Sequence, residues 1–68
     1  MPKMKSYDLA EEAKKHEKDE EWREAERLYL LAAQQLATSR LSQDTKDRAL
    51  YDKAAKRCRR LAQLTVVS

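Results

Sequence analysis

The stretch from Asp19 to Leu36 constrains the fold of this chain more than any other part of the sequence. Large aromatic or aliphatic residues alternate there with alanines at offsets of three and four, which places them all on one side of an α-helix. The alternating residues are Trp22, Ala25, Tyr29, Ala32 and Leu36. Because a small residue beside a large one lets a second helix approach closely, the pattern predicts a helix packed against neighbours.

The composition favours an all-α fold. The chain of 68 residues has no glycine and one proline, 40% of its residues are charged, and strand-favouring residues are scarce. Hydrophobic residues make up 41% of the chain and recur with a helical period, and the net charge is +3, so we expect a folded domain rather than disorder. A chain this short forms one domain, which we place over residues 1–68.

Three helices are expected, over about 6–17, 20–39 and 44–64, with Ser6 and Asp44 as N-caps of the first and third. Eight residues without an apolar side chain separate the first two apolar patterns, so we predict a turn near Lys18, with Asp19 capping the second helix. Residues 65–68 should fray. Short connections between three helices predict an antiparallel up-down-up bundle.

The apolar faces of these helices predict the core. The first helix has a narrow stripe of Leu9, Ala10 and Ala13, and the second has an apolar arc of about 200° that suits a helix lying between two others. The predicted core residues are Ala13, Trp22, Ala25, Tyr29, Ala32, Leu36, Tyr51, Ala54, Cys58 and Leu61.

The pattern of small and aromatic residues resembles that of microtubule-interacting and trafficking (MIT) domains, three-helix modules that share a hairpin with tetratricopeptide repeats. The residues that carry the resemblance are Leu9, Ala13, Trp22, Ala25, Tyr29 and Ala32, followed by the third-helix segment from Leu50 to Leu64. It implies a three-helix fold that grips leucine-spaced helical tails of partner proteins. The chain is either an excised domain of this kind or a complete small protein.

Residues capable of catalysis or metal binding are few. His16 lies in the charged turn, where a general base would lack a dry cleft, and Cys58 belongs to an apolar stripe. One histidine and one cysteine do not make a metal site, and a phosphate loop needs glycine. We therefore expect a protein without enzymatic activity, metal or cofactor. A lone cysteine and the lack of a long apolar run favour a cytoplasmic location without a membrane span.

Basic residues are concentrated in the last third of the chain, where residues 40–68 carry eight basic and three acidic groups, a balance of +5. This basic face could be solvated, meet an acidic protein, or track the phosphates of a nucleic acid, although no aromatic residue interleaves it for base stacking. The alternative function is therefore a small nucleic-acid-binding, phage or plasmid accessory, or inhibitor protein. The basic face consists of Lys53, Lys56, Arg57, Arg59 and Arg60.

The favoured function is a protein-interaction module, a monomer or weak dimer, that holds an amphipathic helix of a partner in a groove between the second and third helices. Leu31 lies outside the apolar arc of the second helix, which makes it a candidate for the floor of that groove. The predicted partner-binding residues are Leu28, Leu31, Gln35, Lys53, Ala54, Arg57, Leu61 and Leu64.

Overall fold

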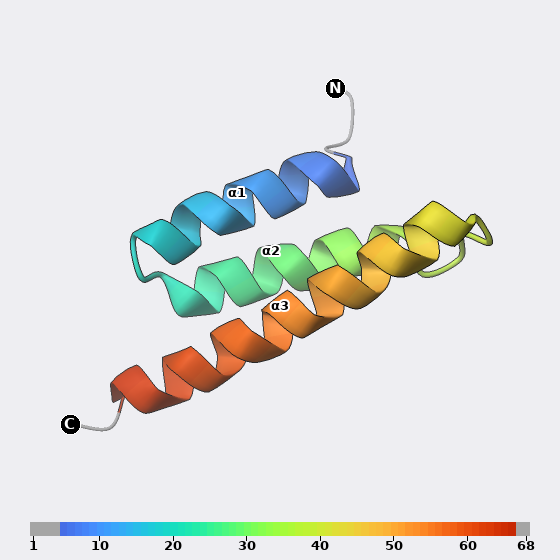
Figure 1. The fold of residues 1–68 in the computed structure, drawn as a ribbon. Coiled ribbons are helices and arrows are strands. Elements are labelled where there is room, and N and C mark those ends of the chain that lie inside the picture. Colours follow the sequence, from blue (N-terminus) through green and yellow to red (C-terminus); the bar gives the residue numbers. More distant parts are fainter. Residues whose placement is uncertain (1–4, 67–68) are drawn as a thin grey trace.

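The computed structural model describes residues 5–66, which hold three α-helices and no strand. The helices are α1 (Ser6–Lys18), α2 (Trp22–Gln35) and α3 (Ser42–Val66). They run antiparallel, each reversing the direction of the one before (Figure 1). The predicted all-α three-helix bundle is confirmed.

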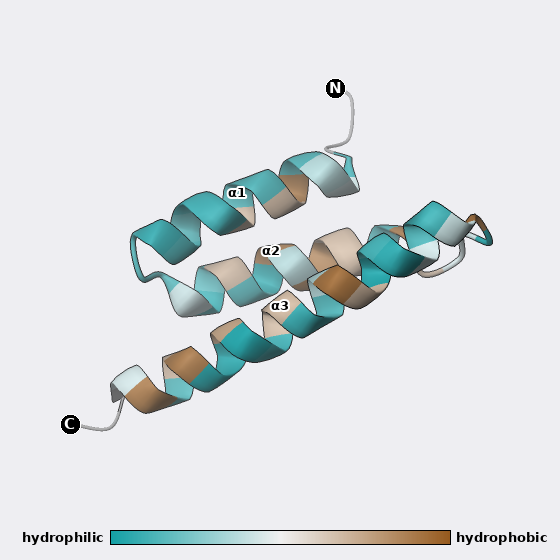
Figure 2. Cartoon of the chain, viewed as in Figure 1, coloured by the Kyte–Doolittle hydropathy of each residue, from teal (hydrophilic) through white to brown (hydrophobic). Residues whose placement is uncertain are grey.

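Helix α2 is the centre of the protein. It packs extensively against both α1 and α3, whereas α1 and α3 approach each other closely in few places. The Cα atoms extend 43 × 26 × 14 Å, so the protein is thin in one direction. In Figure 2, apolar segments recur along α3 between hydrophilic ones, and much of the surface of α1 is hydrophilic. The helices therefore form a shallow layer with α2 in the middle.

The core consists largely of small side chains, which let the helices approach closely. Its larger members are Leu9, Leu28 and Tyr29. The stripe predicted on the first helix is buried, as are five of the ten predicted core residues, and the other five are half-buried. The buried five are Ala13, Ala25, Tyr29, Ala32 and Cys58, and the half-buried five are Trp22, Leu36, Tyr51, Ala54 and Leu61.

The predicted turn near Lys18 is present, but its capping residue was assigned incorrectly. Asp19 ends α1 instead of starting α2, because its N–H bonds the carbonyls of Lys15 at 3.3 Å and His16 at 3.1 Å. The N-cap of α2 is Glu21, which makes no side-chain capping bond. Glu20 between them has φ 59°, in the left-handed region that favours glycine. At the other end of α1, Ser6 is the first helical residue rather than the cap.

The connection from α2 to α3 also differs from the prediction. Helix α2 ends at Gln35, before residue 39, because the N–H groups of Leu36 and Ala37 bond carbonyls three residues back and tighten the chain into turns. Helix α3 begins at Ser42, where the Thr45 N–H reaches the Leu41 carbonyl at 3.0 Å.

Asp44 is not the cap of α3, because its carboxylate accepts a hydrogen bond from the Ser39 hydroxyl at 2.6 Å. The bond lies across the connection and holds the start of α3 close to the end of α2. At the other end, α3 is helical through Val66, beyond its predicted end at residue 64. The fraying predicted for residues 65–68 stays a prediction, and residues 67–68 lie outside the described residues.

Candidate functional site along α3

One carboxylate connects all three helices. The Arg57 guanidinium of α3 donates to both carboxylate oxygens of Glu17 in α1, at 2.9 and 2.8 Å. The Tyr29 hydroxyl of α2 donates to the same carboxylate at 2.5 Å. Tyr51 of α3 stacks on Tyr29 with ring centroids 6.5 Å apart. These contacts fix the orientation of α3, because Arg57 must face α1.

The electrostatics of this connection keep Tyr29 a hydrogen-bond donor. Burial, and then its hydrogen bond to Glu17, raise the pKa of the Tyr29 hydroxyl well above its ordinary value. Partial burial acts to lower the pKa of Arg57, but the hydrogen bond and charge of Glu17 outweigh it and raise that pKa. At neutral pH the connection therefore consists of a neutral phenol and a charged ion pair.

The hollows between α2 and α3, where we predicted the binding groove, are lined by residues other than the predicted binding residues. Shallow hollows follow this junction without α1 residues in their linings, and Leu30, Ala33 and Ala37 lie along one of them. The first three predicted binding residues, Leu28, Leu31 and Gln35, share a different side of α2. Leu28 is 8% exposed and belongs to the core, so it does not form part of an open groove. Leu31 and Gln35 are exposed.

The other five predicted binding residues do lie together, on the side of α3 that includes Arg57. Four of them form a row with Leu50, which we did not predict as a binding residue, at alternating offsets of four and three, the spacing of heptad positions a and d. The fifth, Lys53, lies beside this row. Leu50 and Leu64 are 61% and 64% exposed, large values for aliphatic residues. We call the row the α3 seam, and it consists of Leu50, Ala54, Arg57, Leu61 and Leu64.

Three basic residues flank the α3 seam at seven-residue intervals: Lys46, Lys53 and Arg60. All three are exposed, and none forms an ion pair within the described residues. We call this row the basic edge.

The basic face predicted from the sequence is thus not one surface. Of its five residues, Lys53 and Arg60 belong to the basic edge, whereas Arg57 lies in the seam and pairs with Glu17. Arg59 lines a hollow against α2, together with Arg23 and Glu26. Lys56 is exposed one turn from Lys53 and Arg60, further from the seam. Lys46 was missed because the basic face was placed on residues 53–60.

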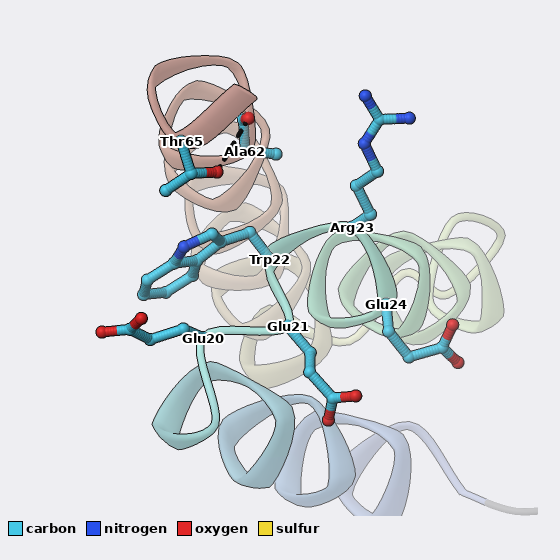
Figure 3. Close-up of a pocket in the computed structure, with 7 residues that line it drawn as sticks. All are labelled: Glu20, Glu21, Trp22, Arg23, Glu24, Ala62 and Thr65. Carbon is cyan, nitrogen blue, oxygen red and sulfur yellow. Dashed lines mark hydrogen bonds between the residues drawn. The ribbon is translucent and has the colours of Figure 1, made fainter. Parts of the chain in front are cut away.

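A pocket of about 260 Å³ lies where the start of α2 meets the end of α3 (Figure 3). The Trp22 indole extends beside Thr65, whose hydroxyl donates to the Ala62 carbonyl at 3.0 Å, and Glu21 and Glu24 point away from the indole. The buried indole N–H has no hydrogen-bond partner among the described residues. The geometry is that of a packing contact, with no pair of groups arranged for acid–base chemistry.

Neither predicted chemical candidate is arranged for catalysis. His16 Nδ1 lies 2.8 Å from a Glu21 carboxylate oxygen in the α1–α2 turn, which closes the turn. Cys58 is fully buried, and burial raises the pKa of its thiol, so the reactive thiolate is disfavoured. Among residues 5–66 no three His, Cys, Asp or Glu side chains gather as a metal site. In the same range no helix has the length and apolar character needed to cross a membrane.

Comparisons with protein-family models, with curated proteins and with solved structures found no match. The resemblance to MIT domains therefore stays a prediction from the residues, and the functional argument depends on the geometry of α3.

Proposed function

We propose that this protein is a non-enzymatic interaction module that binds an amphipathic helix of a partner protein along the α3 seam. The observation that carries the proposal is the exposure of Leu50 and Leu64 at heptad spacing, on a helix whose own buried residues are small. In coiled coils a row of this spacing packs into holes on a facing helix. The site differs from the groove between α2 and α3 that we predicted, because Arg57 faces α1.

The dimensions of the α3 seam suit one helix. From Leu50 to Leu64 it spans about 21 Å at 1.5 Å per residue, nearly four turns. Its half-buried members, Ala54 and Leu61, form a floor between the more exposed leucines. Apolar burial at roughly 25 cal/mol per Å² would supply most of the affinity, before the costs of ordering are subtracted.

A nucleic acid is the second candidate, because the basic edge has three cations without an acidic partner in residues 5–66. Phosphates would use those cations but would leave Leu50 and Leu64 without apolar contacts. The seam and its basic edge also contain no aromatic side chain on which bases could stack. The apolar row therefore favours a protein helix.

The first prediction uses leucines on four different surfaces. A displayed library of amphipathic helical peptides is selected against the protein, and the retained peptides are then measured on variants by fluorescence anisotropy. The double change Leu50→Asp with Leu64→Asp should weaken binding at least about tenfold, because it places two charges in the apolar contact.

Leu41→Asp is the matched control, since Leu41 is 68% exposed in the connection before α3. Leu30→Asp and Leu31→Asp test the α2–α3 hollow and the opposite side of α2. Binding that survives the changes at Leu50 and Leu64 but is lost with Leu30→Asp or Leu31→Asp would contradict the assignment to α3. Circular dichroism establishes that each variant stays helical.

A further inference from the structure

One flank of the α3 seam is exposed to solvent, and the charged residues of that flank, the basic edge, are all positive. In heptad notation Leu50, Arg57 and Leu64 occupy d positions, and the basic edge occupies the g position before each a. The corresponding e positions on the other flank include Tyr51, half-buried, and Cys58, buried. An approaching helix would therefore meet the basic edge on its solvent side and the protein core on the other.

The protein already shows which group this surface binds. Glu17, on the neighbouring helix α1, places its carboxylate on Arg57 in the middle of the seam, with both oxygens within 3 Å of the guanidinium. A carboxylate from a helix lying beside α3 is thus an observed contact of this surface. The three cations of the basic edge, Lys46, Lys53 and Arg60, have no such partner within the described residues.

The same arrangement disfavours other occupants. In an antiparallel pair, a second copy of α3 would place its own basic edge opposite this one, and like charges across a helix pair repel. In a parallel pair the basic edge would face the e positions, where Tyr51 and Cys58 are already packed in or against the core. A membrane surface needs a broad apolar face, whereas the row exposes two leucines strongly, Leu50 and Leu64. The acids near this surface already have partners within the protein. Glu17 pairs with Arg57, Asp47 accepts a hydrogen bond from Gln43, and Asp52, which lines a hollow with Leu50 and Lys53, lies 4.0 Å from Arg48.

We propose that the partner of the α3 seam is an acidic heptad helix, with aliphatic residues in its a and d positions and carboxylates along the flank that meets Lys46, Lys53 and Arg60. This inference rests on the proposed function and adds the chemistry of the partner. The carboxylates select the partner and its orientation and accelerate association, and the leucines supply most of the affinity. Arg57 contributes less than the three edge cations, because Glu17 already occupies it.

The test uses three synthetic helices, each three heptads long and identical at a and d, with glutamate, glutamine or lysine at the flanking positions. We expect the glutamate helix to bind at least about tenfold more tightly than the lysine helix at low salt, and the difference to shrink at high salt. The glutamine helix should fall between them. Equal binding of the glutamate and glutamine helices would overturn the acidic partner and leave the proposed function standing.

Charge reversal provides the matched control. The triple change Lys46→Glu, Lys53→Glu and Arg60→Glu should reverse the preference toward the lysine helix, as expected when flanking charges set partner choice. Arg23→Glu, Arg40→Glu and Arg59→Glu together make the same change in net charge at exposed positions away from the basic edge and should keep the preference for glutamate. An unchanged preference in the triple variant would overturn the assignment of the basic edge.

Two further outcomes separate this inference from the proposed function. If none of the three helices binds, and the peptide selection retains no leucine-bearing helix, the proposed function fails with the inference. Suppose instead that a single-stranded oligonucleotide binds with steep salt dependence, unaffected by Leu50→Asp and lost in the triple variant. The surface would then recognise phosphates, and the acidic helix would be wrong.

Discussion

Helices α2 and α3 differ in how deeply their largest apolar side chains are buried. In α2, Leu28 is 8% exposed and Tyr29 3% exposed, whereas in α3 Leu50 and Leu64 are more than half exposed. The buried residues of α3 are Ala55, Cys58 and Ala62. The two helices thus contribute differently, since α2 buries Leu28 and Tyr29 in the core, whereas the buried residues of α3 are small and its Leu50 and Leu64 stay at the surface.

The difference follows from the number of neighbours. Helix α2 lies between two helices, so both sides of its wide apolar arc are covered. Helix α3 packs mainly on α2, and a narrow strip of small residues is enough for that contact. Leu50 and Leu64, which are mostly exposed, add little to the stability of the isolated protein. The stability of the fold therefore does not explain the leucines at these exposed positions, whereas contact with a partner helix would.

The largest expected effect tests this comparison directly. Leu28→Ala should lower the free energy of unfolding by about 3 kcal/mol, because it leaves a cavity in a small core. Leu50→Ala removes the same atoms from the surface and should change it by less than about 0.5 kcal/mol. Urea denaturation followed by circular dichroism measures both. Similar losses in the two variants would show that the leucines of α3 belong to the core after all.

A smaller effect on stability is expected at high pH, and it tests the tyrosines that pack in or against the core. Burial raises the pKa values of Tyr29 and Tyr51 above 10, so the folded state holds these protons after the unfolded chain has released them. Their contribution to stability is fully present below about pH 10 and is lost as the pH rises further toward the folded pKa values. Denaturation midpoints measured at increasing pH should fall over this range.

Two variants separate the causes of that alkaline loss. Tyr29→Phe should flatten the pH dependence above pH 10, and losing its hydrogen bond to Glu17 should cost about 1 kcal/mol at neutral pH. Glu17→Gln keeps the phenol and its burial, the larger cause of the shift, so most of the alkaline loss should persist. An unchanged pH dependence in Tyr29→Phe would assign the loss to other groups.

The smallest effect concerns the α1–α2 turn, far from the α3 seam. Glu20→Gly should raise the free energy of unfolding by up to about 1 kcal/mol, because glycine adopts the observed positive φ without a steric penalty. Asp19→Gly, at φ −89°, should instead destabilise the protein through the entropy of the unfolded chain. Thermal melts compare the two. Peptide binding should be the same in both variants, since the turn does not touch the seam.

The sequence was sufficient for the fold because helical periodicity is a strong local signal. The arc of α2 and the polar run around Lys18 predicted the bundle and its first turn. The caps were predicted poorly because serine and aspartate have competing partners. Asp44 bonds Ser39, and Asp19 completes α1 through its backbone. Capping depends on contacts that spacing does not reveal.

The residues of the proposed site coincide only in part with those predicted, for a related reason. Spacing placed Lys53, Ala54, Arg57, Leu61 and Leu64 on one face of the third helix, and the structure keeps them together. It could not show which neighbour that face meets, because periodicity fixes positions around a helix and not the rotation of the helix in the bundle. The Glu17–Arg57 contact, between residues 40 positions apart, supplies that rotation.

The thinness of the protein, 14 Å across its shortest Cα dimension, has a consequence for how its stability should be understood. A bundle one helix deep has edge helices, just as an open sheet has edge strands, and α3 is an edge helix with exposed leucines. A helix added there would complete a second row of packing and bind the folded state in preference to the unfolded chain. The melting temperature is then a property of the protein and its occupant together, and rises with the concentration of whatever lies on α3.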